Sequence, residues 1–247
     1  MKKVALIISA YNEENNIKVM YDSLKENTLD LNYEFDICFV DDGSTDTSYE
    51  IIKSLSDIDK KVKILKFIHN FGHEEAMIGG IDYFTGYDYY ILLDCDMQHP
   101  PKYIKNILES LDDGHDAVFM RREDNDSRSA ITNFLSSAYY DLFNLLFRGR
   151  VIKSVSDFLA LNENLAVEVR NKYRYKNRLL RYILQTIAKN PAVIDYTPVK
   201  RYSGESKYPF RKYFLLALSS VHCMILLNKK SNLSDLHYEI DTAKSIK

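Results

Sequence analysis

Two aspartates one residue apart follow an apolar run that is short enough for a buried strand. The run spans residues 89–93, and Asp94 and Asp96 come directly after it. Because alternate residues of an extended chain point to the same side, both carboxylates are expected at one spot at the end of the strand. Two such anions in partly buried surroundings need a cation, and Mg²⁺ or Mn²⁺ shared with substrate phosphates fits oxygen ligands. A strand that ends in a solvated acidic turn is the alternative.

Polar residues also follow two other predicted strands. Asn12 and Glu13 come after the strand at residues 4–8, and Asp41 and Asp42 come after the strand at residues 35–40. Ligands of open α/β sheets bind beyond the carboxyl ends of the strands, so these loops are expected to line one crevice with the aspartate pair. This arrangement predicts a nucleotide-type site. No glycine-rich phosphate loop is present, so a metal and basic residues would have to hold a diphosphate.

The elements that must position these residues alternate along the chain. Strands are predicted at residues 4–8, 35–40, 62–67 and 89–93, each followed by a helical pattern, which indicates an α/β fold with a parallel sheet. Gly79 and Gly80 lie inside one helical pattern and are interpreted as a close-packing site. Further on, we expect strands at 116–120 and 193–199, helices at 101–111, 130–147 and 177–187, an apolar run at 155–161 and a loosely held polar end after residue 228.

Composition limits the class of protein. The chain has 247 residues, 46% of them hydrophobic, which suits one large domain with a core. The net charge of −2 argues against a general nucleic-acid binder. Three scattered cysteines, Cys38, Cys95 and Cys223, form no disulfide or zinc pattern and fit a reducing compartment. No signal peptide is expected, and the apolar stretch at 214–227 is shorter than the ~20 residues of a membrane span.

Several motifs, in this order, resemble those of family 2 glycosyltransferases with a GT-A fold: residues 9–14 (SAYNEE), 40–46 (VDDGSTD) and 94–101 (DCDMQHPP). Residues 157–161 (DFLAL), 177–181 (NRLLR) and 201–208 (RYSGESKY) are similar to the polyprenyl-phosphate sugar transferases within that family, which include dolichol-phosphate mannose synthase. The resemblance covers residues 4–220. It implies a transferase domain over residues 1–228, with the nucleotide sugar bound by residues 1–120, the acceptor and a basic lid in 121–228, and a polar tail at 229–247.

The resemblance also implies roles for individual residues. The metal and the diphosphate would be held by Asp94, Asp96 and Gln98. Arg122, or its neighbour Arg121, would close over the phosphates. The remaining assignments are Ser9, Tyr11, Glu13 and Asp41 to the base and ribose with Asp42 beside them, Arg201 and Lys207 to a basic lid, and Asp157 to the acceptor side.

The implied reaction is metal-dependent, inverting transfer of a hexose-type sugar from a nucleotide diphosphate, with uracil favoured over guanine as the base. Asp96 and Asp157 would carry the catalysis. The acceptor implied is a polyprenyl phosphate at the inner face of the membrane, and the aromatic residues 130–147 and the basic, then apolar residues 210–227 favour this surface. Many relatives continue into two membrane helices that are not expected here. A soluble transferase that uses Asp157 as a general base toward a glycan or protein hydroxyl therefore stays open, as does a non-catalytic nucleotide-sugar-binding subunit.

Overall fold

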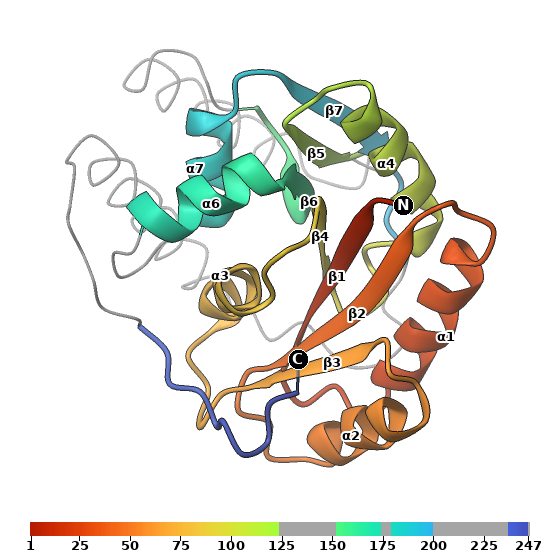
Figure 1. The fold of residues 1–247 in the computed structure, drawn as a ribbon, viewed down its shortest axis with the longest axis vertical. Coiled ribbons are helices and arrows are strands. Elements are labelled where there is room, and N and C mark those ends of the chain that lie inside the picture. Colours follow the sequence, from red (N-terminus) through yellow and green to blue (C-terminus); the bar gives the residue numbers. More distant parts are fainter. Residues whose placement is uncertain (124–151, 174–178, 200–236, 247) are drawn as a thin grey trace, which may run out of the picture.

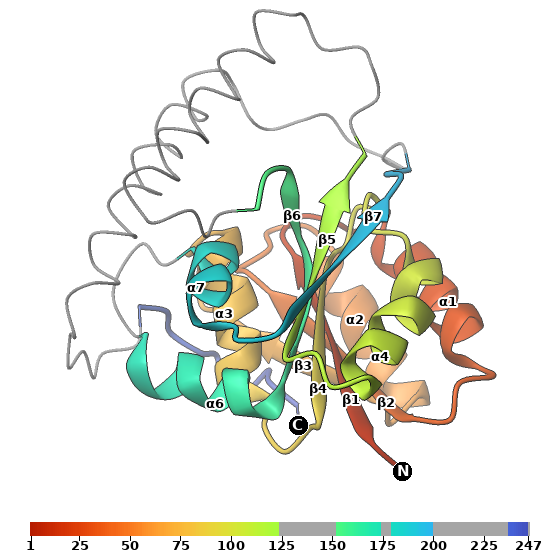
Figure 2. The same ribbon diagram turned by 90° about the horizontal axis from the view of Figure 1, so that it is seen from above.

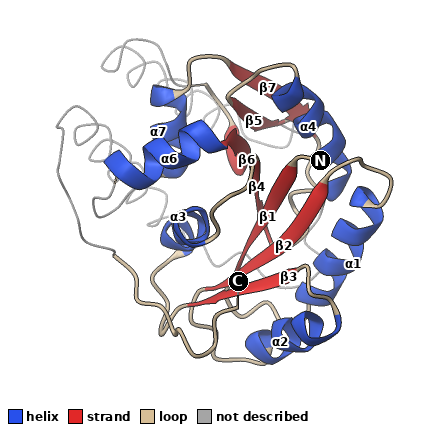
Figure 3. Cartoon of the chain, viewed as in Figure 1, coloured by secondary structure: helices blue, strands red, loops and turns tan. Residues whose placement is uncertain are grey.

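The computed structural model describes residues 1–123, 152–173, 179–199 and 237–246. In these ranges seven strands form one sheet in the order β3–β2–β1–β4–β6–β5–β7, with helices on both faces (Figure 1; Figure 3). The strands are β1 (Lys3–Ala10), β2 (Glu34–Asp41), β3 (Val62–Lys66), β4 (Tyr89–Asp94), β5 (Ala117–Arg122), β6 (Val155–Asn162) and β7 (Pro191–Tyr196). The helices are α1 (Ile17–Thr28), α2 (Ser48–Ile58), α3 (His73–Tyr83), α4 (Ile104–Asp112), which follows the 3-10 turn η1 (Pro101–Tyr103), α6 (Glu163–Lys172) and α7 (Leu180–Ile187).

The first four strands are parallel, as the alternating pattern predicts. β1 pairs with β2 on one side and with β4 on the other, and β3 lies outside β2. In this register Ala10 is level with Asp41, and Ser9 is level with Asp94. The polar loops that follow β1, β2 and β4 therefore meet at one edge of the sheet.

β6 reverses the direction of the sheet. It runs antiparallel to both β4 and β5, while β5 and β7 run parallel to each other and in the same direction as β4. The start of β6 therefore lies at the same edge as the carboxyl ends of the other strands. The strand predicted at 193–199 is placed too late, because β7 spans Pro191–Tyr196. Pro191 is tolerated there as the first residue of a strand, where its missing N–H interrupts no ladder.

The two faces of the sheet carry separate cores. Along β1 the side chains of Val4, Leu6 and Ile8 point to the face covered by α1, α2 and α4, and Ala5 and Ile7 point to the opposite face. Figure 2 shows α3, α6 and α7 together over that opposite face. The alternation follows from the two-residue period of a strand, and an almost wholly apolar strand is what a sheet covered on both faces requires.

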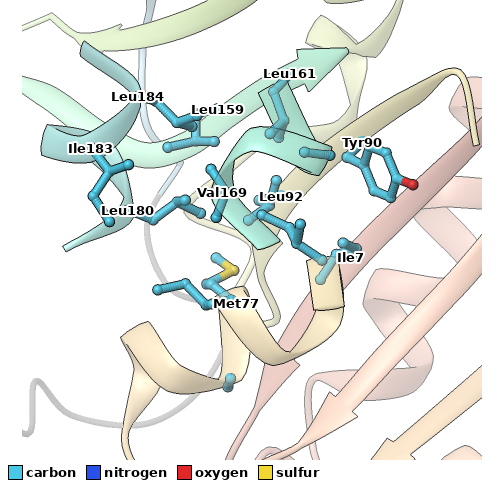
Figure 4. Packing of buried hydrophobic residues seen from close by; sticks show 14 of the residues in the cluster. Ile7, Met77, Tyr90, Leu92, Leu159, Leu161, Val169, Leu180, Ile183 and Leu184 are labelled. Carbon is cyan, nitrogen blue, oxygen red and sulfur yellow. The ribbon is translucent and has the colours of Figure 1, made fainter. Parts of the chain in front are cut away.

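The α3 face holds a core that joins the sheet to α3, α6 and α7. Figure 4 shows Ile7 and Leu92 of the sheet against Met77 of α3, Val169 of α6 and Ile183 of α7. Each of these side chains is at most 2% exposed. A buried aliphatic side chain of this kind stabilises the fold by about 1.5–3 kcal/mol. The core thus fixes α3 and α7 relative to β4, and both helices begin at the functional edge.

Two glycines let α3 approach the sheet closely, which confirms the packing interpretation of Gly79 and Gly80. A Cβ added at Gly80 would lie 2.5 Å from Cγ2 of Ile7, and one at Gly79 would lie 2.6 Å from Cζ of Phe67. Neither position has room for a methyl group without movement of its neighbour. These residues serve helix–sheet contact and form no phosphate loop.

The loosely held end expected after residue 228 is wrong for residues 237–246. Within this segment Ile240 and Ile246 form antiparallel bridges with Phe67 and Ile64 at the outer side of β3. Tyr238 is 4% exposed and belongs to the α3-side core. No helix in the described ranges is both long and apolar enough to cross a bilayer. The predicted helix at 130–147 lies outside the described residues.

Candidate active site

Ser9, Asp94 and Asp157 form a row across three neighbouring strands at the carboxyl edge. Ser9 pairs with Asp94 between β1 and β4. Leu92 of β4 pairs with Leu159 of β6, so two further steps along the same antiparallel register bring Asp94 level with Asp157. The row lies on the α3 face, because Leu92 and Leu159 belong to the core on that face and alternate residues of a strand share a side. The sheet itself thus brings the carboxylates of Asp94 and Asp157 to the same edge and the same face.

His73, the first residue of α3, contacts all three members of this row. Its Nδ1 lies 3.1 Å from Oγ of Ser9, and its Nε2 lies 3.4 Å from Oδ1 of Asp94 and 3.6 Å from Oδ2 of Asp157. Burial disfavours a charged imidazole, but Asp94 and Asp157 outweigh it and raise the pKa of His73 to about 10. The sequence reasoning missed His73. The polar loop after the third strand was the available signal, because that loop ends at the same edge as the other three.

Asp157 is held between two cations. Nη1 of Arg181, near the start of α7, lies 3.3 Å from Oδ1 of Asp157, opposite the oxygen that faces His73. Burial opposes ionisation of Asp157, but Arg181 and then His73 prevail and hold its pKa well below the usual range. Asp157 is therefore a carboxylate at any physiological pH and a weak base.

Glu74 ties the start of α3 to the start of α7. Its Oε2 accepts a hydrogen bond of 3.1 Å from the backbone N–H of Leu180. Burial, followed by the neighbouring charge of Asp157, raises the pKa of Glu74 to about 7. Glu74 therefore places Arg181, the next residue of α7, against Asp157.

The chain turns immediately after Asp94, which changes the reasoning for the aspartate pair. β4 ends at Asp94, Met97 adopts φ 67°, and Oδ1 of Asp96 accepts a 3.0 Å hydrogen bond from the backbone N–H of Gln98. The expectation that an extended chain aligns Asp94 and Asp96 is wrong, because residues 95–98 form a turn. Asp96 is 7% exposed and its oxygen fixes that turn.

His99 holds the end of β4 through a hydrogen bond to the backbone of Asp94. It is 3% exposed, and its Nδ1 accepts a 3.0 Å hydrogen bond from the backbone N–H of Asp94. Its ring stacks on Phe158 at 5.2 Å and meets Tyr196 edge-on at 6.2 Å. Burial lowers the pKa of His99, so the ring is neutral with its proton on Nε2, which faces Oδ2 of Asp94 at 3.7 Å. His99 is a buried support for Asp94. Cys95, predicted as a small buried residue, is 2% exposed.

Arg122 is the arginine of β5 that faces the turn. Its Nη2 donates a 3.2 Å hydrogen bond to Oε1 of Gln98. The neighbouring Arg121 instead makes a two-pronged ion pair with Asp195 of β7, at 2.5 and 2.8 Å. Of the two arginines considered from the sequence, the structure brings Arg122 to the site and turns Arg121 away. Arg201 and Lys207 of the predicted lid lie outside the described residues.

The loops after β1 and β2 are bound together at the other end of the edge. The backbone N–H of Asn12 donates to Oγ of Ser44 at 3.0 Å, and that of Glu13 donates to Oγ of Ser48 at 2.8 Å. Asn12 adopts φ 54°, and its Oδ1 accepts from the backbone N–H of Thr45 at 2.9 Å. Tyr11 and Glu13, predicted to contact the nucleotide, are partly exposed on this double loop.

Asp41 and Asp42 shape the double loop from inside. Asp41 is fully buried, and its oxygens pair with Nζ of Lys66 at 2.6 Å and with the backbone N–H of Ser44 at 2.8 Å. Asp42 accepts backbone hydrogen bonds from Phe71 and Gly72 at 2.7 and 2.9 Å. Burial raises the pKa of Asp42 to about 6 against these bonds. Both carboxylates thus have protein partners and hold the loops in place, and their contact with base and ribose stays a prediction.

Two buried polar atoms that make no hydrogen bond to a described residue are candidates for contact with a metal and a diphosphate, and one of them, Oδ1 of Asp94, already faces Nε2 of His73 at 3.4 Å. Oδ1 of Asp94 is buried and accepts no hydrogen bond within the described part of the chain, and Nε of Arg122 is buried without an acceptor there. A carboxylate oxygen and a guanidinium N–H suit a divalent ion and a phosphate oxygen respectively. Across the described ranges no three His, Cys, Asp or Glu side chains are grouped as a metal centre. The ion would therefore be held by Asp94, Asp96 and the amide oxygen of Gln98 together with oxygens of the substrate.

The sequence comparison identifies the family. Residues 5–163 match the family described as Glycosyl transferase family 2. This chain belongs to that family. The family 2 chain is 31% identical to the putative glycosyltransferase CsbB of Bacillus subtilis (strain 168) over 218 residues, which are 88% of this chain and 65% of that protein. It is 28% identical to the prophage bactoprenol glucosyl transferase homolog of Escherichia coli (strain K12) over 219 residues, which are 89% of this chain and 71% of that protein. The chain spans about two thirds of the length of these two relatives.

Solved structures show the same fold at low identity. Glucosyl-3-phosphoglycerate synthase from Mycobacterium tuberculosis, in complex with Mn²⁺, UDP and phosphoglyceric acid, superposes with a TM-score of 0.66 at 14% identity, over 98% of this chain and 86% of that one. Mannosyl-3-phosphoglycerate synthase from Rubrobacter xylanophilus gives 0.62 at 14% identity, over 95% and 77%. With the mostly parallel sheet, this likeness establishes the GT-A fold predicted from the motifs.

Proposed function

We propose that this family 2 glycosyltransferase moves a hexose from a uridine diphosphate sugar to a polyprenyl phosphate at the inner face of the membrane, with inversion at the anomeric carbon. The observation that carries the proposal is the setting of Asp157 between Arg181 and His73. A carboxylate whose pKa is held this low is a poor base for a sugar or protein hydroxyl. A phosphate acceptor has a second pKa of about 6 and needs no base at neutral pH.

The comparisons support the same acceptor and donor. The relative from Escherichia coli is named for transfer of glucose to bactoprenol, a polyprenyl lipid. The neighbour from Mycobacterium tuberculosis was crystallised with Mn²⁺ and UDP. The sequence of residues 130–147 and 210–227 supports contact with the membrane surface, although both segments lie outside the described residues.

In the proposed reaction the double loop at Asn12 and Ser44 binds the nucleoside, and Arg122 donates to the diphosphate. Asp94, Asp96 and Gln98 would hold a divalent ion, which would supply positive charge to the leaving diphosphate. Attack by an acceptor phosphate oxygen forms a new bond at the anomeric carbon while the bond to the diphosphate oxygen breaks and its electron pair leaves with the nucleotide. Asp157 repels and orients the incoming phosphate.

The test is a transfer assay with Mn²⁺ or Mg²⁺ and a panel of UDP- and GDP-sugars, offered a short polyprenyl phosphate or a hydroxyl acceptor. We expect a UDP-sugar to be consumed with the phosphate acceptor. Asp94→Asn should reduce turnover by about 10²-fold or more, because an orienting and charge-bearing ligand is lost. Asp157→Asn should lower turnover without moving the pH profile, since the titrating group belongs to the acceptor.

Two results would contradict the proposal. Transfer to hydroxyl acceptors alone, with an Asp157→Asn variant that loses the acidic limb of the pH–rate profile, would make Asp157 a general base and the acceptor a glycan or protein. Nucleotide binding without consumption of any donor would identify a non-catalytic nucleotide-sugar-binding subunit. Arg121→Gln serves as a control, because Arg121 pairs with Asp195 away from the turn.

A further inference from the structure

Residues 237–246, called the brace below, cross the outer side of β3 (the blue segment in Figure 1). Ile64 and Ile246 exchange both backbone hydrogen bonds, at 2.8 and 2.7 Å. The backbone of Lys66 is also bonded to the brace on both sides. Its carbonyl accepts from the N–H of Asp241 at 2.8 Å, and its N–H donates to the side-chain Oγ of Ser245 at 3.1 Å. The brace therefore occupies the edge that β3 would otherwise leave open.

Tyr238 anchors the brace to the core. Its ring stacks on that of Phe67 at 4.8 Å, and its hydroxyl donates to Oδ2 of Asp82 in α3 at 2.9 Å. The side chain is 4% exposed. Tyr238 is the one buried residue of the brace, so its ring is expected to contribute strongly to the attachment of this segment.

A second anchor lies on α2. The hydroxyl of Tyr49 donates to the carbonyl of Lys244 at 3.3 Å. The ammonium groups of Lys66 and Lys244 both lie over the Tyr49 ring, 5.2 and 5.5 Å from its centre. Two cations at one aromatic ring join β3, α2 and the brace.

Both anchors connect to the ends of the loop that joins β2 to α2, the first because the backbone N–H of Phe67 donates to the carbonyl of Asp41 at 2.9 Å. At the start of the loop, Nζ of the buried Lys66 holds Asp41, whose other oxygen accepts from the N–H of Ser44. Oγ of Ser44 accepts in turn from the N–H of Asn12 in the loop after β1. Shortly after the loop, Tyr49 is held by Lys244. A continuous series of contacts therefore runs from the brace to the double loop.

We propose that the brace and Lys66 position the loop at residues 41–48, so that the brace sets the affinity for the nucleotide and leaves the rate of transfer nearly unchanged. The inference rests on the proposed function, because it takes this loop to be the nucleotide contact. Lys66 and Tyr238 are positioning residues, since they act through Asp41 and Phe67. The stability of the loop at residues 41–48 can be measured by hydrogen exchange without any nucleotide. A failure of this inference can therefore be distinguished from a failure of the proposed function.

The test uses the full chain with Tyr238→Ala. Calorimetric titration with UDP and Mn²⁺ should show a dissociation constant raised about tenfold, while turnover at saturating donor stays within about twofold of the wild type. Amide hydrogen exchange should become faster in peptides covering residues 41–48. Tyr238→Phe keeps the stacked ring and should restore both properties. Ile246→Ala, which disturbs the brace less, should give smaller changes in the same direction.

The control is Leu111→Ala in α4, a buried side chain 3% exposed in the core on the other face, with stability compared by thermal melting. Wild-type UDP affinity and wild-type exchange at 41–48 in Tyr238→Ala would overturn the inference. So would the same two changes in Leu111→Ala, because the effect would then be general destabilisation. If the wild type binds no UDP, the proposed function fails, and exchange at 41–48 alone decides whether the brace positions the loop.

Discussion

The site gathers its charges in alternation: Asp94, His73, Asp157 and Arg181 follow one another, with each neighbouring pair between 3.3 and 3.6 Å apart. Each carboxylate thus has a cation beside it before any substrate arrives. Breaking one pair would leave an uncompensated charge in partly buried surroundings, which is far more destabilising than loss of an exposed pair. These ion pairs therefore stabilise the arrangement of the four side chains. In the proposed reaction a phosphate acceptor would approach this arrangement.

Glu74 makes a testable contribution to pH dependence. Its folded-state pKa of about 7 lies above the value of an unfolded glutamate, so the folded protein binds the proton more readily. Stability from this group therefore increases as pH falls from 8 toward 5, on the order of 1–2 kcal/mol. Glu74→Gln, which can still accept from Leu180, should flatten this part of the profile when unfolding by denaturant is measured across pH.

The matched control is Glu50→Gln, an exposed glutamate in the first turn of α2. It should leave the pH profile of stability unchanged. An identical slope in wild type and Glu74→Gln would mean that Glu74 is ionised in the folded protein at neutral pH.

Individual site residues were predictable where a strand ends in a polar loop. That argument located Asp94, Asp41 and the loop at Asn12, and the motif resemblance added Asp157 and Arg122. It missed His73 because the loop after β3 was not treated in the same way. Arg181 was noted only within a motif, since a register between distant strands and helices decides which cation meets Asp157, and no local pattern encodes that register.

At the level of elements, α3 depends on the absence of side chains at two positions. Gly80→Ala would normally stabilise a helix by up to about 1 kcal/mol, through propensity. Here the new methyl group would lie 2.5 Å from Cγ2 of Ile7, so we expect destabilisation of about 1–3 kcal/mol in denaturant unfolding.

A double-mutant cycle with Ile7→Ala isolates the contact. Removal of the Ile7 side chain opens the space, so Gly80→Ala should be less harmful in the Ile7→Ala background than in the wild type. Additive effects of the two substitutions would show that α3 can shift away from the sheet without loss.

The alternating pattern predicts most elements of the first half, because long periodic segments bounded by polar turns are a strong signal. The direction of β6 was not predictable. An apolar run such as residues 158–161 has the same pattern in either direction, and its neighbours are chosen by distant strands. The end of β4 is predicted within one residue, but the course of the chain after it is not, because the turn at residues 95–98 depends on Asp96 accepting a hydrogen bond from the backbone N–H of Gln98.

For the whole molecule, the fold class was predictable from the sequence. Whether the surface of the molecule binds a membrane is a separate question. If the acceptor is a membrane lipid, the full chain should associate with vesicles. We expect flotation with liposomes that contain anionic lipid, and weaker flotation at high salt, because the sequence at 201–213 is basic before the apolar residues 214–227.

Neutral phosphatidylcholine liposomes at the same salt concentration are the control. Failure to float with either lipid, together with transfer to a water-soluble acceptor, would remove the membrane from the account. Anionic liposomes, anionic liposomes at high salt and neutral liposomes thus distinguish electrostatic membrane binding, apolar membrane binding and no membrane binding.

The reversed direction of β6 separates the position of Asp157 from the length of the connection that precedes this strand. β6, the strand that carries Asp157, is held between β4 and β5, so a change in the length of the connection between β5 and β6 need not displace it. Because β5 and β6 are antiparallel neighbours, the connection leaves and re-enters the sheet at the same edge. The two strands that meet His73 from this side, β4 and β6, are therefore held by the sheet, whatever the length of the connection between β5 and β6.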